Sequence, residues 1–76
     1  MRRLSEDELK IFLYKFDESG MALTHHGHPL IFQGFYSFNE NSKDAKVQYC
    51  SKCQKYFAFL GSGVFEVSEK ELEEAD

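Results

Sequence analysis

The sequence predicts an α+β fold, in which antiparallel β-hairpins are flanked by an amphipathic N-terminal helix and a short acidic C-terminal helix. Two observations predict it. Apolar residues near the N-terminus recur at the spacing of one helix face, whereas the middle of the chain consists of short aromatic-rich segments separated by turn residues. The 76 residues suffice for one domain, whose hydrophobic core alone gives marginal stability. We therefore expect a single domain over residues 1–76 that is stabilised by a bound metal.

The first predicted helix begins at Ser5, because Ser5 and Glu8 have the spacing of a capping box. Its apolar face consists of four residues at helical spacing: Leu9, Phe12, Leu13 and Phe16. We expect the helix to end near Gly20, acting as a C-terminal cap. Ile11 and Tyr14 lie outside the apolar face and are therefore candidate partner-binding residues, either for another protein or for a homodimer.

The remainder of the chain predicts strands, turns and one more helix. The predicted strands cover residues 21–24, 29–38, 45–49, 55–60 and 64–67. The segment 39–44 has the composition of a loop, and the sequence GSG at 61–63 predicts a tight turn. Ser68 and Glu71 repeat the capping-box pattern, so a short acidic helix is expected over residues 68–75.

Histidines and cysteines supply the candidate metal ligands: His25, His28, Cys50 and Cys53. In a C-x-x-C turn the intervening peptides fold back, so that two thiolates can converge on one ion. Zn²⁺ takes four such ligands in a tetrahedron, and two thiolates neutralise its charge. His26 is the alternative to His25, because in an extended segment the side chains of His26 and His28 would share a face. His28 belongs to both alternatives.

This arrangement resembles a zinc ribbon, in which two β-hairpin knuckles clamp a structural zinc ion. The resemblance covers about residues 21–67, with HHGH as the first knuckle and CSKC as the second. The chain differs from the usual pattern because its first knuckle has histidines and because Gln54 stands where a glycine often follows the second pair. Zinc ribbons occur in transcription and translation machinery, so the resemblance implies a small regulator of transcription machinery.

Two other uses of these residues are less consistent with the sequence. A redox-active C-x-x-C is expected to be followed by a helix, whereas the residues after Cys53 predict a strand. A catalytic zinc needs an open position and a nearby acid or base, and neither ligand segment contains a carboxylate. We therefore expect a structural zinc in a non-enzymatic protein-interaction module.

The charge and hydropathy of the sequence limit the kinds of partner that we expect. The formal net charge is −4, which does not favour an extensive surface for binding nucleic acid. The alternative function is weak binding of single-stranded nucleic acid or RNA through a basic, aromatic segment containing Lys46, Lys52, Lys55 and Tyr56. No apolar run approaches the length of a membrane span, and no signal-peptide pattern is present, so we expect a cytoplasmic protein.

Overall fold

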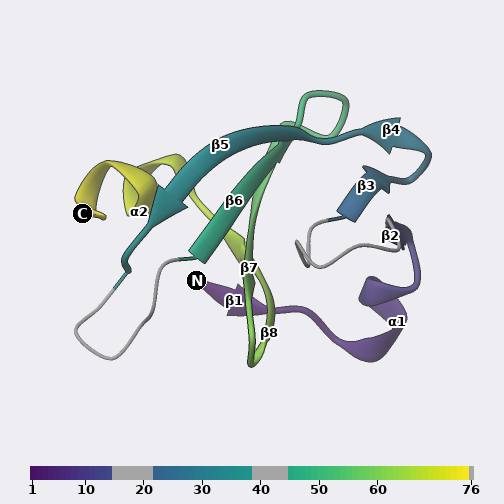
Figure 1. The fold of residues 1–76 in the computed structure, drawn as a ribbon, viewed down its shortest axis with the longest axis horizontal. Helices are drawn as coiled ribbons and strands as arrows, with labels where there is room; N and C mark the ends of the chain where they lie inside the picture. The colour runs from purple at the N-terminus through teal and green to yellow at the C-terminus, as the bar shows by residue number, and fades with distance from the viewer. Residues whose placement is uncertain (15–21, 39–44, 76) are drawn as a thin grey trace.

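The computed structural model describes residues 1–14, 22–38 and 45–75, without the side chains of Leu13, Tyr14 and Leu23. Among these residues, two antiparallel sheets and two short helices are present (Figure 1). The larger sheet has the order β1-β8-β7-β6-β5, formed by Arg2–Arg3, Gly63–Val67, Lys55–Leu60, Ala45–Cys50 and Ile31–Tyr36. The smaller sheet has the order β2-β3-β4, formed by Phe12–Tyr14, Ala22–His25 and His28–Pro29. The helices are α1, Glu6–Leu9, and α2, Glu69–Glu74.

The N-terminal helix is much shorter than predicted. Its capping box is confirmed, since the Ser5 hydroxyl accepts from the Glu8 N–H and the Glu8 carboxylate accepts from the Ser5 N–H. The prediction that the helix continues across Phe12 and beyond is wrong, because Phe12–Tyr14 form β2 and pair with β3. The run from Ile11 to Tyr14 contains branched and aromatic residues, which pack well in strands, and pairing with β3 prevails over the helical spacing. The expected cap at Gly20 lies outside the described residues.

The predictions for the second half of the chain are largely confirmed. β7 covers the predicted residues 55–60, and β6 and β8 differ from the predicted strands by one residue each. α2 begins after Ser68, whose hydroxyl accepts from the Glu71 N–H in the predicted capping box. The expected loop over residues 39–44 lies outside the described residues.

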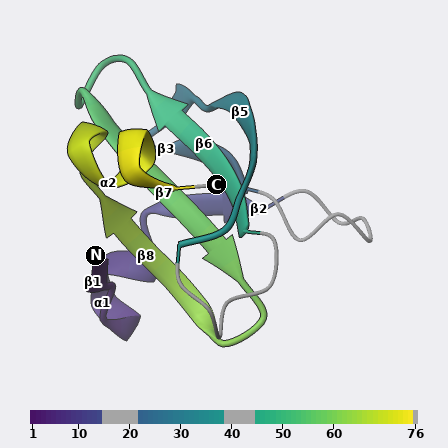
Figure 2. The same ribbon diagram turned by 90° about the vertical axis from the view of Figure 1, so that its left-hand side faces the viewer.

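The larger sheet is covered on both faces. On one face, Cys50, Phe57 and Phe59 pack with Phe12 and Ala22 of the smaller sheet. On the other face, a second cluster of buried residues packs against Leu72 of α2 and against several partly buried aromatic side chains. The buried residues of this cluster are Ala45, Val47, Ala58 and Val67. Figure 2 shows α2 in front of β7 and β8, with the strands of the smaller sheet behind them.

Gln48 connects the two sheets. Its side chain is 4% exposed, donates from Nε2 to the Ala22 carbonyl at 2.9 Å and accepts from the Ala22 N–H at 3.1 Å. The amide of Gln48 therefore pairs with the backbone of β3 as a neighbouring strand would. Both buried backbone groups of Ala22 are satisfied by this one side chain.

Candidate metal centre

Three of the four predicted ligands converge at the boundary between the two sheets. His25 ends β3, Cys50 ends β6, and Cys53 lies in the turn that joins β6 to β7. One ligand atom of each residue lies within 4.8 Å of the other two. Cys50 is fully buried and His25 is 5% exposed, so the cluster is largely shielded from solvent.

A tight turn positions His25. His26 and Gly27 form the loop between β3 and β4, and both have positive φ values, 53° and 76°. Positive φ at both central residues is the requirement of a type I′ turn, the commonest connection of a two-residue hairpin. This turn pairs His25 with His28 across the hairpin.

The distance between two of the donors fits a tetrahedral ion. Cys53 Sγ and His25 Nδ1 are 3.4 Å apart. Zinc bonds of the usual length to sulfur and nitrogen, at a tetrahedral angle, place these atoms about 3.6 Å apart. The His25 ring is held in place by Phe12 and Phe57, with ring centroids at 4.8 and 4.6 Å. The arrangement therefore fits an ion that prefers sulfur and nitrogen donors.

The surroundings of His25 and Cys53 shift the pKa values of both side chains. Burial lowers the pKa of His25, and the charges of His26, Lys55 and His28 lower it further, so the neutral imidazole is favoured. Burial raises the pKa of the Cys53 thiol, and a hydrogen bond with Cys50 adds to this shift. A metal binds neutral imidazole and thiolate, so metal binding to these residues would release protons and would strengthen as the pH rises.

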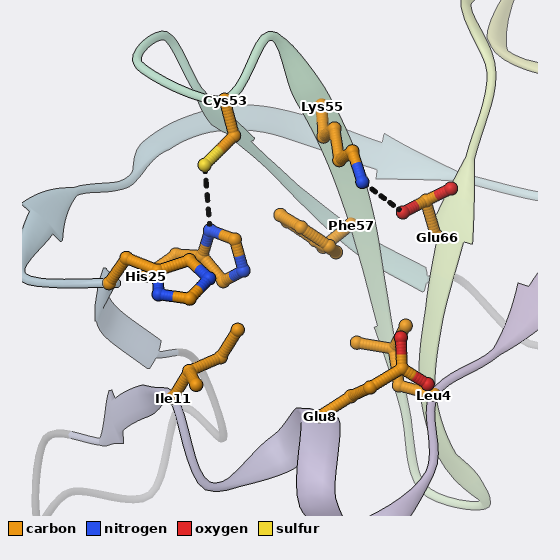
Figure 3. A pocket seen from close by; sticks show the side chains of 9 residues that line it. Leu4, Glu8, Ile11, His25, Cys53, Lys55, Phe57 and Glu66 are labelled. Atoms are coloured by element: carbon orange, nitrogen blue, oxygen red, sulfur yellow. Dashed lines mark hydrogen bonds and ion pairs between the residues drawn. The ribbon is translucent and has the colours of Figure 1, made fainter.

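A pocket of about 280 Å³ adjoins the cluster (Figure 3). His25, His26 and Cys53 line it on the metal side, and its other lining residues are Leu4, Glu8, Ile11, Lys55, Phe57 and Glu66. Figure 3 shows His25 and Cys53 across the pocket from Leu4 and Glu8. Lys55 Nζ lies 3.2 Å from Glu66 Oε1, and two nitrogens of Arg2 lie 3.0 and 2.8 Å from the Glu8 carboxylate oxygens.

The remaining predicted site residues lie elsewhere or in other surroundings. His28 is not part of the ligand cluster, although it pairs with His25 across the hairpin. Ile11 is half-buried, packs against the core and lines the pocket. The helix that made Ile11 and Tyr14 candidates for a binding face does not extend to them, and the Tyr14 side chain lies outside the described residues.

The predicted nucleic-acid residues do not gather on one face. The register of β6 and β7 places Lys46 and Lys55 on the same face of the larger sheet, and Tyr56 on the opposite face. Lys52 is exposed in the turn between these strands. Tyr56 packs beside Tyr49, with ring centroids 4.5 Å apart, and Lys55 is paired with Glu66.

The sequence prediction missed exposed apolar side chains on both faces of β5. β5 is an edge strand, and Ile31, Phe32 and Phe35 are 52%, 44% and 60% exposed. The Phe32 and Phe35 rings are 5.4 Å apart, because a bulge between Phe32 and Gly34 brings both onto one face. The signal in the sequence was the absence of charge over residues 28–38 combined with adjacent apolar residues, which cannot all face one core.

No protein-family model matches the chain, and no curated protein or solved structure is significantly similar to it. Within the described part of the chain, no helix has the length and apolar character needed to cross a membrane.

Proposed function

We propose that the chain is a zinc-binding, non-enzymatic protein-interaction module. The observation that carries this proposal is the cluster of His25, Cys50 and Cys53, whose donor atoms come from two hairpins of different sheets. A zinc ion there joins the two sheets, as the zinc of a ribbon joins two knuckles. In zinc-finger peptides such binding is worth on the order of 10–16 kcal/mol at neutral pH, far more than a small core alone supplies.

Elemental analysis of protein purified without a polyhistidine tag tests the metal. We expect one zinc per chain, and loss of zinc with severe destabilisation in Cys50→Ser and in His25→Ala, because each substitution removes a donor. The control is Ser51→Ala, an exposed change in the same turn, which should retain full zinc content. A zinc content near zero in the wild-type protein, together with freely reactive thiols, would refute the proposal.

The interaction surface that we propose is the edge of the larger sheet at β5. Among the described strands β5 lies at an edge, where a partner strand can add backbone hydrogen bonds. Phe32 and Phe35 offer apolar contact on one face of this edge, and Ile31 on the other. Charged residues normally protect such an edge, but residues 28–38 contain none. The partner is another protein or a second copy of the chain. A partner in transcription machinery is supported by the zinc-ribbon resemblance alone.

The interface is tested by placing a charge at its centre. Phe35→Glu should abolish partner capture, or self-association measured by sedimentation, because a carboxylate would have to be buried against the partner. Gln33→Glu is the control, since it adds the same charge to the same strand without removing an aromatic ring. Both variants should keep their zinc. If Phe35→Glu binds the same partners as the wild type, the interface does not include β5.

A further inference from the structure

We infer that the fourth position of the bound metal opens into the pocket beside His25 and Cys53 and binds a small thiol. This inference rests on the proposed zinc binding and adds a ligand to that site. Its basis is the contrast between the donor cluster, which holds three residues, and the tetrahedron that zinc requires.

The three donors differ in their relation to the pocket. Cys50 is fully buried and does not line the pocket, whereas His25 and Cys53 form part of the pocket wall. An ion held by all three therefore has protein behind it and the pocket of about 280 Å³ in front. His28 is neither in the cluster nor among the lining residues. Among the described residues no fourth predicted ligand joins the cluster, so the fourth position of the tetrahedron is assigned to the pocket.

His26 is the one competitor from the protein among the described histidines and cysteines that line the pocket. Its ring centroid lies 4.5 Å from that of His25, yet it is absent from the donor cluster. Its backbone is fixed by the hairpin turn at a φ of 53°, and its side chain is exposed to solvent. His26 is therefore an exposed residue of the pocket wall that the donor cluster does not include, and it leaves the fourth position accessible.

The surroundings can accommodate a thiol with a short aliphatic body. Leu4, Ile11 and Phe57 give the pocket apolar walls that suit a short aliphatic body. The Glu8 carboxylate already accepts from Arg2, and the Glu66 carboxylate is ion-paired with Lys55. Neither carboxylate therefore presents an uncompensated charge that would recruit a charged ligand. A zinc ion with sulfur and nitrogen donors accepts a further thiolate readily. The entering thiol releases its proton to the buffer and binds through sulfur in place of solvent.

Cobalt substitution tests this directly in the wild-type protein. Co²⁺ bound at the site should show the visible absorption of tetrahedral coordination, and 2-mercaptoethanol should add a saturable sulfur-to-cobalt charge-transfer band. Ethylene glycol, which has hydroxyls in place of the thiol, should change nothing. If the cobalt spectrum does not respond to the thiol, or if the thiol only strips the cobalt, the inference is overturned while metal binding stands. If no Co²⁺ or Zn²⁺ binds at all, the proposed function fails first.

Two sets of variants complete the test. Ile11→Trp places a larger side chain in the pocket and should weaken thiol binding at least tenfold while cobalt is retained; Ile31→Trp, on the exposed edge strand, is its control. His26→Ala and His28→Ala should leave the visible spectrum of the cobalt protein unchanged. A changed spectrum in either histidine variant would show that the protein itself fills the fourth position, and would overturn the inference.

Discussion

Glu8 serves two structural purposes through one carboxylate. It accepts from the Ser5 N–H as part of the capping box of α1, and it accepts from two nitrogens of Arg2. The Arg2 hydrogen bonds are the largest cause that lowers the pKa of Glu8 to about 2, and the Ser5 N–H contributes next. The folded protein therefore stabilises the ionised form of Glu8 relative to its protonated form.

The lowered pKa predicts how acid affects this part of the fold. Because the folded pKa lies below the usual value, the stabilisation by Glu8 is complete above about pH 4.5 and is lost as the pH falls towards 2. Glu8→Gln should therefore be less stable than the wild type at pH 6, and the difference should shrink between pH 4.5 and 2. Chemical denaturation at a series of pH values measures this. Glu6→Gln, in the same helical turn, is the control and should show no such convergence.

Residue identity was enough to find the candidate metal centre, but not to choose among the histidines. The sequence predicted His28 in both alternatives and His25 in one of them, whereas the structure brings His25 and not His28 to the cysteines. The choice depends on the type I′ turn and on the packing of Phe12 and Phe57 around the His25 ring. Neither the turn type nor contacts between distant segments can be read from the spacing of ligands.

At the scale of elements, the hairpin turn between β3 and β4 depends on a glycine. Gly27 has a φ of 76°, in the left-handed region that residues with a Cβ atom avoid. A Cβ atom there would meet nothing within 4 Å, so any cost of adding one comes from the backbone alone. The same open space surrounds Gly61, which does not have a positive φ.

A comparison of alanine substitutions at Gly27 and Gly61 isolates the free-energy cost of the left-handed backbone conformation in the turn. Gly27→Ala should destabilise the zinc-bound protein by about 1–2 kcal/mol, because alanine must adopt the left-handed conformation. Gly61→Ala should change the free energy of unfolding by less than about 0.5 kcal/mol. Denaturant unfolding of both variants gives the comparison. Equal effects at the two positions would mean that the turn does not constrain the hairpin.

Short-range sequence patterns predicted some helices and strands correctly and others wrongly. Both capping boxes and the strands from Ala45 to Val67 were correct, because capping and alternation are local properties of the sequence. The segment after Leu9 was assigned to a helix, since its apolar residues have helical spacing, but pairing of Phe12–Tyr14 with β3 determines its structure. Pairing with a strand that is distant in the sequence does not show in the local spacing of apolar residues.

At the scale of the whole molecule, Gln48 is a second link between the sheets besides the donor cluster. Its amide satisfies both the N–H and the carbonyl of Ala22 inside the core. Gln48→Met retains most of the side-chain volume but removes both hydrogen bonds. It should destabilise the protein by about 1–3 kcal/mol, because buried backbone groups lose their partners.

The measurement for Gln48→Met is again the free energy of unfolding, and Gln33→Met is the control. Gln33 is exposed and its side chain donates to the nearby Ile31 carbonyl, so its replacement should be nearly neutral. A neutral Gln48→Met would indicate that β3 can find other partners for Ala22.

The position of the donors along the chain has a consequence for folding. Cys50 and Cys53 belong to one local turn, whereas His25 lies 25 positions before Cys50 (50 − 25). A metal that joins them closes a long loop, and a covalent cross-link of that span removes about 3 kcal/mol of entropy from the unfolded chain. The β6–β7 hairpin can form and load the ion through its two thiolates first, since its contacts are local. Capture of His25 would then be an intramolecular step, so a bound ion would set the order in which the two sheets assemble.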